Sequence, residues 1–226
     1  MDVMVYYIIG IISFAIVSLA QAYVKRNYSK YSKVDSKGNI TGAEIARKIL
    51  KANGLDKVYV VETQGVLTDH YDPSRKVVRL SSSNYNDTSI AAVAVAAHEC
   101  GHALQDKDNY FLLRLRAALV PIVNISNKAG YIIIMIGVFA NIFNLVILGI
   151  ILLGSILLFH LVTLPVEINA SKRAMEKIEK MHLLTGDEVG KGRSMLIAAA
   201  LTYVASVLSS LLEIFRLLLV YGNRDE

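Results

Sequence analysis

The chain has one cysteine, Cys100, in 226 residues and few charged side chains. A single cysteine excludes an internal disulfide and fits a reducing compartment. Charged residues make up 19% of the chain, hydrophobic residues make up 54%, and the mean hydropathy is +0.45. A chain with this composition is too apolar to be an ordinary soluble domain. The composition therefore predicts a membrane protein.

Charge is absent from the N-terminal segment between Val3 and Val24. A helix needs about 20 apolar residues to cross a bilayer, so this segment is long enough. A cleaved signal peptide has a shorter apolar core and a basic start, whereas here the acidic Asp2 comes before the run and Lys25 and Arg26 follow it. We therefore predict a retained membrane helix over 3–24.

A second uncharged segment, 129–164, contains 36 residues. As one helix it would measure about 54 Å at about 1.5 Å per residue, nearly twice the hydrocarbon thickness of a bilayer. Two helices, 118–141 and 145–164, joined by a turn over 141–144, fit this length better. We predict a membrane hairpin over 118–164.

The last apolar block predicts a fourth membrane helix over 195–221. It contains Glu213 and Arg216, which are three residues apart and so share a helix face. We interpret them as a local ion pair near the helix end, with Arg216 extending towards the membrane surface.

Basic residues are concentrated in two polar stretches. Of the 24 Lys and Arg residues, 15 lie in 25–118 and six in 171–193, where they alternate with acids. This asymmetry predicts a multi-pass protein of the cell membrane, with both polar stretches in the cytoplasm and both termini outside. Because acids are interleaved, the net charge of +5 does not indicate nucleic-acid binding.

The polar stretch 28–117 predicts a small folded part. Thr41–Glu44 forms a capping box, which begins a short helix. Segments 57–63 and 76–81 are rich in β-branched residues and predict two strands. We expect Val77–Ser81 to be the edge strand that would bind a peptide backbone.

The segment His98-Glu99-Cys100-Gly101-His102 ends an Ala/Val-rich helical run that Asp87 or Thr88 would cap. Residues four apart share a helix face, so His98 and His102 can bind one metal ion. Glu99 would lie beside that ion as a general base. The alternative is a surface helix whose two histidines bind nothing. Cys100 is turned away from the histidines and is expected in the core.

A catalytic zinc usually has three protein ligands, and no third histidine follows at short spacing. Glu167 is the best carboxylate, because it directly follows an apolar run and Pro165, a plausible start for a helix within 165–194. Glu176 and Glu179 alternate with lysines and indicate a solvated face. The two membrane helices that precede Glu167 return the chain to the side of the histidines.

Two further residues are candidates for stabilising a transition state. His70 or the hydroxyl of Tyr71 could stabilise an oxyanion. His160 and His182 lack ligand spacing, so we interpret them as structural.

Four segments together resemble a known family: 67–73, 78–81, 96–105 and 164–171. They are similar to YugP-type members of the neutral zinc metallopeptidase family, and more distantly to the heat-shock protease HtpX and the CAAX prenyl protease. The resemblance implies one Zn²⁺ per chain, bound by His98, His102 and Glu167, with Glu99 as the catalytic base. The distant relatives carry an aspartate four residues after the glutamate to orient a histidine. Here that position is Ser171, which leaves the orienting partner open.

These features predict an α+β integral membrane protein, mainly helical, with four membrane helices and a small zincin-like part. The expected function is zinc-dependent cleavage of peptides or membrane proteins at the cytoplasmic membrane surface. A non-catalytic zinc scaffold or assembly factor is the alternative, although a structural site needs no base such as Glu99. Cleavage within the bilayer is disfavoured because the apolar run before His98 has only nine residues. The sequence does not define the substrate or the oligomeric state.

Overall fold

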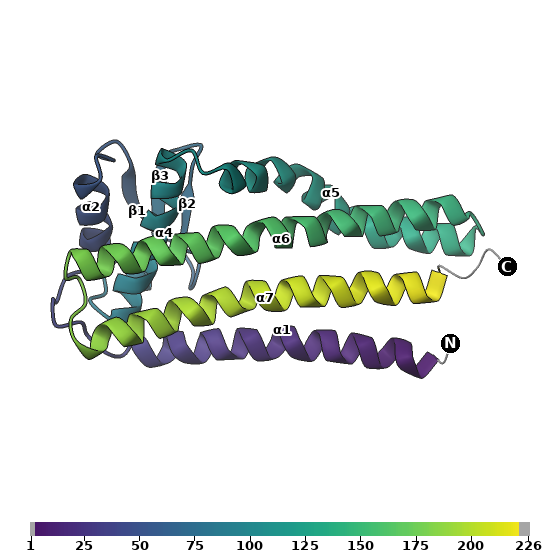
Figure 1. Cartoon of the computed structure of the whole chain (residues 1–226), viewed down its shortest axis with the longest axis horizontal. Helices are drawn as coiled ribbons and strands as arrows, with labels where there is room; N and C mark the ends of the chain where they lie inside the picture. The colour runs from purple at the N-terminus through teal and green to yellow at the C-terminus, as the bar shows by residue number, and fades with distance from the viewer. Residues whose placement is uncertain (1–2, 222–226) are drawn as a thin grey trace. The chain divides into compact units, whose positions relative to one another are not determined.

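The computed structural model describes residues 3–221 (Figure 1). The elements in chain order are α1 (Val3–Tyr31), α2 (Gly42–Ala52), β1 (Tyr59–Thr63), β2 (His70–Asp72), β3 (Val77–Ser81), α3 (Ser82–Tyr85), α4 (Ile90–Lys107), α5 (Phe111–Phe139), α6 (Phe143–Lys180) and α7 (Asp187–Tyr221). Long helices and one small sheet confirm the predicted α+β class.

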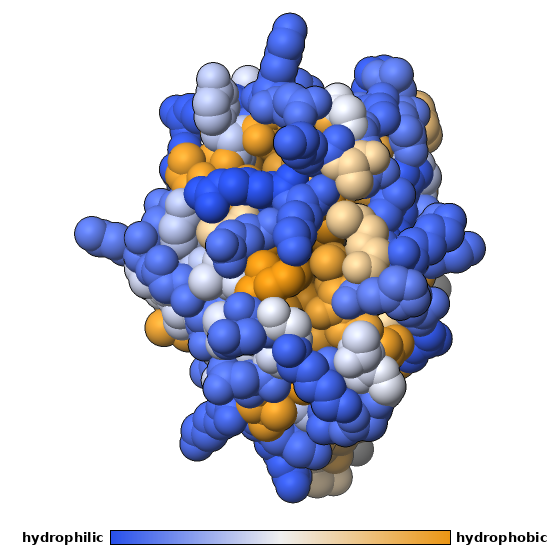
Figure 2. Space-filling model, turned by 90° about the vertical axis from the view of Figure 1, so that its left-hand side faces the viewer, coloured by the Kyte–Doolittle hydropathy of each residue, from blue (hydrophilic) through white to orange (hydrophobic). Residues whose placement is uncertain are grey.

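The chain forms two compact units. The helical unit contains the described residues 3–21, 111–165 and 202–221, and the α/β unit contains 22–110 and 166–201. Helices α1, α6 and α7 contribute residues to both units. Figure 2 shows the face that contains α2, where hydrophilic side chains surround a smaller group of hydrophobic ones.

The four predicted membrane helices correspond to α1, α5, α6 and α7. Each is long and apolar enough to cross a membrane. All four begin earlier or end later than the apolar segments, because a helix continues through polar residues as long as its backbone hydrogen bonds are made. The predicted turn is confirmed, since α5 ends at Phe139, α6 begins at Phe143 and Asn141 adopts φ 55°.

The prediction that a helix begins at Pro165 is wrong. Helix α6 passes through Pro165 and continues to Lys180. Proline removes only one helical hydrogen bond. The turns that follow are held by an apolar stripe of four completely buried residues, Val166, Ala170, Ala174 and Ile178. The break predicted at 165 therefore comes at 181–186, between α6 and α7.

Helix α4 lies at the core of the α/β unit. Between Ile90 and Ala97 it is apolar on all sides, which is typical of a fully buried helix. The core also includes Ile45 and Ile49 of α2 and Leu80 of β3. The predicted capping box of α2 is confirmed. For α4, however, the N-cap is Ser89, whose Oγ accepts the N–H of Ala92 at 3.2 Å, rather than residue 87 or 88.

The sheet has the strand order β1-β3-β2. Strand β3 pairs in parallel with β1 and antiparallel with β2. The prediction that Val77–Ser81 is an edge strand is therefore wrong, because β3 is central. The short strand β2 was not predicted, since three residues are too few to show alternation. It occupies one edge of the sheet.

The helical unit contains hydrogen bonds between its helices. Ser126 Oγ on α5 lies 2.8 Å from Ser155 Oγ on α6, and Ser13 Oγ on α1 lies 2.6 Å from Ser209 Oγ on α7. Hydroxyl pairs of this kind hold helices together in a membrane, where the hydrophobic effect between them is weak.

Candidate metal centre

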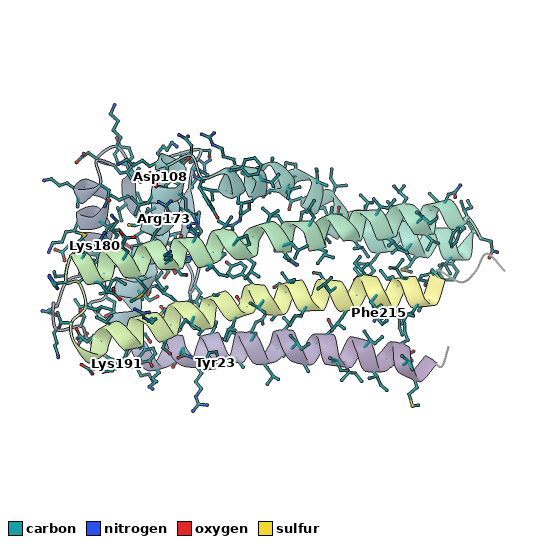
Figure 3. All side chains as sticks on the ribbon, viewed as in Figure 1. Tyr23, Asp108, Arg173, Lys180, Lys191 and Phe215 are labelled. Atoms are coloured by element: carbon teal, nitrogen blue, oxygen red, sulfur yellow. The ribbon has the colours of Figure 1, made fainter. Side chains whose placement is uncertain are left out.

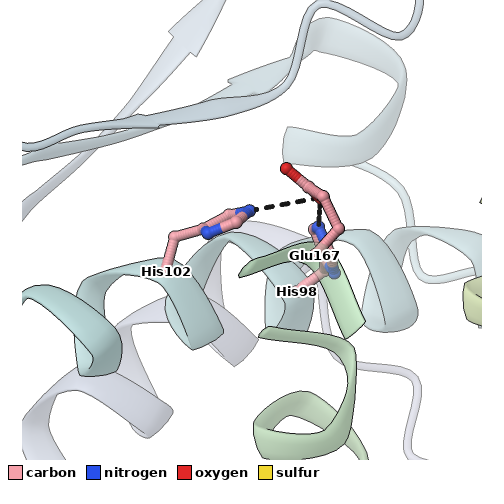
Figure 4. A group of neighbouring side chains, drawn as sticks. All are labelled: His98, His102 and Glu167. Carbon is pink, nitrogen blue, oxygen red and sulfur yellow. Dashed lines mark hydrogen bonds and ion pairs between the residues drawn. The ribbon is translucent and has the colours of Figure 1, made fainter. Parts of the chain in front are cut away.

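Three predicted ligand residues meet in the α/β unit (Figure 4). His98 and His102 project from α4, and Glu167 projects from α6 between them. Glu167 Oε2 lies 3.1 Å from His98 Nε2 and 3.5 Å from His102 Nε2. The candidate ligand atoms all lie within 4.8 Å of one another.

The distances between Glu167 and the two histidines fit a tetrahedral zinc ion. Zinc–ligand bonds of about 2.0–2.1 Å separate neighbouring ligand atoms by about 3.3 Å. The two distances to Glu167 Oε2, 3.1 and 3.5 Å, lie on either side of that value. Two imidazoles and one carboxylate are also a donor set that catalytic zinc uses, with one position left for water.

The candidate ligands differ in exposure. Glu167 is 3% exposed and His102 is 7% exposed, so both are buried. The side chain of His98 is 14% exposed. A carboxylate buried next to two imidazoles has little water to solvate it, so a cation at this position would offset its charge.

Ser171 contacts the first histidine. Its Oγ lies 3.2 Å from His98 Nδ1. When Nε2 of His98 binds a metal, Nδ1 carries the proton and can donate it to Ser171 Oγ. The partner that the sequence left open is therefore a hydroxyl on α6.

Gln105 contacts the second histidine. Its Oε1 lies 2.9 Å from His102 Nδ1, and its Nε2 donates to Val166 O at 2.7 Å and to Asn169 Oδ1 at 3.0 Å. Gln105 is completely buried, so these bonds fix its orientation. Sequence analysis missed this residue. The available signal was a polar residue three positions after His102, directly after the apolar pair Ala103 and Leu104.

A further ion pair extends this network. Arg173 Nε donates to Asn169 Oδ1 at 2.9 Å, and the guanidinium of Arg173 pairs with Asp108 just after α4 (Figure 3). The segment that carries Glu167 is thus tied to the end of the helix that carries the histidines.

Glu99 is buried on α4 and is not one of the converging ligand atoms. Burial raises the pKa of its carboxyl to about 7, and nearby His98 partly opposes that rise. The backbone amide of Tyr71 also lowers this pKa, which places Glu99 beside β2. A carboxyl group with a pKa near neutrality can exchange a proton at physiological pH.

His70 and Tyr71 do not join the cluster. The Tyr71 hydroxyl donates to Asp106 Oδ2 at 2.7 Å, and burial together with Asp106 raises the pKa of Tyr71. His70 is exposed, and its Nδ1 lies 2.8 Å from Thr68 O. Neither contact is directed towards the metal ligands.

Gly101 sets the distance between α4 and α6. A Cβ atom at this position would lie 2.4 Å from the carbonyl oxygen of Ala170. Sequence analysis missed this role, although a glycine inside a helix is itself a signal, because it costs about 1 kcal/mol relative to alanine.

We expect Gly101→Ala to lower thermal stability and to move Glu167 away from the histidines, because α6 must shift to admit the methyl group. Gly190→Ala is the matched control. It is also a helical glycine, but a Cβ there meets nothing within 4 Å. The control should keep or raise stability. A thermal-unfolding experiment in detergent compares them, and equal midpoints for Gly101→Ala and the unchanged protein would contradict the packing argument.

Comparison with known proteins agrees with this geometry. The family described as "Putative neutral zinc metallopeptidase" matches residues 6–222. The chain is 47% identical over 208 residues to "Putative membrane protease YugP" of Bacillus subtilis (strain 168), covering 92% of each chain. No solved structure matches it. With the match extending over nearly its whole length, the chain belongs to the neutral zinc metallopeptidase family.

Proposed function

We propose that the protein is an integral-membrane zinc endopeptidase, with His98, His102 and Glu167 as zinc ligands. The observation that carries this proposal is that these three side chains, which come from two helices, converge on one point. His98 and Glu167 are 69 residues apart in the sequence. Zinc bound there would polarise the substrate carbonyl and lower the pKa of a bound water.

Glu99 is the proposed general base. It lies next to His98 on α4 but outside the ligand set, so its carboxylate remains available for proton transfer. It would take a proton from the attacking water and return it to the leaving amine.

Strand β2 is the proposed binding strand for the substrate backbone. It pairs with β3 on one side only among the described strands, and Tyr71 at its centre lies near Glu99. A peptide added along this edge would have its carbonyl groups close to the ligand cluster.

Enzyme function is favoured over the scaffold alternative. A structural zinc site does not require a buried carboxyl group beside its ligands, and Glu99 is one. Cleavage inside the bilayer is not favoured, because α4 belongs to the α/β unit and is not among the four helices with membrane-spanning length and hydropathy.

We expect purified protein to hold about one zinc per chain, measured by elemental analysis. His98→Ala, His102→Ala and Glu167→Ala should each lose most of it, because three protein ligands are the usual minimum for a catalytic site. Glu176→Ala, an exposed acid on the same helix α6, is the control and should retain zinc. Full zinc retention by Glu167→Ala would show that the third ligand is a different residue.

Glu99→Gln should keep zinc and thermal stability but lose peptidase activity. Glutamine preserves the shape of the side chain and cannot accept the proton, and loss of a general base costs a factor of about 10² to 10⁴. Cleavage of an unfolded casein substrate, measured beside zinc content, tests this. Near-normal cleavage would rule out the proposed role of Glu99.

The cytoplasmic orientation follows from the Lys/Arg asymmetry and can be tested by labelling. Asp56→Cys and Lys172→Cys are at exposed positions of the α/β unit, and Asn144→Cys is at an exposed position in the first turn of α6. The native Cys100 is buried and should not react. In intact cells an impermeant maleimide should label only position 144. Labelling of 56 and 172 with protection of 144 would invert the topology.

A further inference from the structure

The helical unit contains a cavity of about 450 Å³ whose lining includes both polar and hydrophobic side chains. Residues of α1, α5, α6 and α7 line it, and all four helices have membrane-spanning length and hydropathy. Its polar side chains include one carboxylate and one guanidinium, Glu213 and Arg216.

These two charges form an ion pair within the bundle. Arg216 Nη2 donates to Glu213 Oε1 at 2.6 Å, and the Tyr131 hydroxyl donates to the same oxygen at 2.9 Å. The Arg216 guanidinium lies over the ring of Tyr6, 4.4 Å from its centre. The predicted ion pair between Glu213 and Arg216 is thus confirmed.

The ion pair leaves some hydrogen-bonding capacity unused. Among the described residues, Arg216 Nε is buried without a hydrogen-bond partner. Both bonds to Glu213 end on Oε1, which leaves Oε2 as an acceptor. Glu213 and Arg216 both line the cavity, which therefore has a carboxylate acceptor and a guanidinium donor side by side.

The cavity lies well inside the length of its helices. Glu213 precedes the end of α7 at Tyr221 by eight residues, and Tyr131 precedes the end of α5 at Phe139 by eight. Eight residues correspond to about 12 Å of helix. Charged side chains within membrane-spanning segments are costly and usually functional.

Hydroxyl and amide groups add to this character. Ser13 and Ser209, which bond each other at 2.6 Å, line the cavity together with Ser210 and Asn127. The remaining lining residues are mostly hydrophobic. Because the carboxylate and the guanidinium cancel, the lining favours a neutral group that both donates and accepts hydrogen bonds over a free ion.

We propose that this cavity binds an amide or hydroxyl side chain carried by a membrane-spanning segment of a protein substrate. A segment of that kind reaches the cavity from the bilayer, and its polar side chain would gain partners that lipid does not offer. The cavity is too small for a helix, which is about 10–12 Å across, but large enough for side chains. The role as a substrate site rests on the proposed peptidase function.

Binding of a model transmembrane peptide tests the site without any catalysis. One peptide carries an Asn about 12 Å from one end of its apolar segment, and its partner carries Leu there. Zinc-loaded Glu99→Gln protein in phosphatidylcholine vesicles should bind the Asn peptide about tenfold more tightly by fluorescence energy transfer, the equivalent of one hydrogen bond of about 1.4 kcal/mol.

Glu213→Leu combined with Arg216→Met should abolish this preference. Both charges are removed together, so no unpaired charge is left in the bundle and the fold should persist. Ser126→Ala combined with Ser155→Ala removes an interhelical hydroxyl pair that is not part of the cavity lining, and should keep the preference. Equal binding of the two peptides, or an unchanged preference in the Leu/Met variant, would overturn the proposal. The polar lining of the cavity would then be explained by a bound lipid or by a purely structural ion pair.

Casein cleavage by the Leu/Met variant, without the Glu99 substitution, separates the two hypotheses. Casein has no membrane segment, so its cleavage should be unchanged by the loss of the cavity. Loss of casein cleavage in the variant with zinc still bound would show that the ion pair supports the catalytic unit and would contradict a role confined to membrane substrates.

Discussion

The close approach of α4 and α6 is the constraint on which the candidate site depends. At Gly101 the two helices are so close that one methyl group would overlap the carbonyl of Ala170. This proximity is what allows Glu167, on α6, to reach the two histidines of α4. The same contact lets Gln105 bond the backbone of Val166 and lets Ser171 reach His98. Packing, ligand geometry and histidine orientation are therefore consequences of one helix pair.

Much of the site could be predicted because it is encoded locally. The spacing of His98 and His102 places both on one helix face whatever the rest of the chain does. Glu167 could be predicted in a different way, since the two membrane helices predicted between it and the histidines would return the chain to the same side. Gln105 and Gly101 were not found, because their importance depends on contacts with residues more than 60 positions away.

The incorrect predictions share a physical cause. A proline favours a helix start locally, but Pro165 lies within a helix that four buried apolar residues stabilise beyond it. Strand β3 was expected at the edge of the sheet, but it is central because it pairs in parallel with β1 and antiparallel with β2, which was not predicted. In each case tertiary contacts outweighed a local preference.

The two sites differ in the groups that surround their carboxylates. In the α/β unit a carboxylate lies between two imidazoles, and the other nitrogen of each ring contacts a neutral side chain. In the helical unit the carboxylate already has a guanidinium partner, and a cation has little to gain there. The first arrangement suits a metal ion, whereas the second suits a neutral hydrogen-bonding group. In the proposed peptidase, the first site would act on the peptide bond, and the second would hold a polar side chain of a membrane-spanning substrate segment.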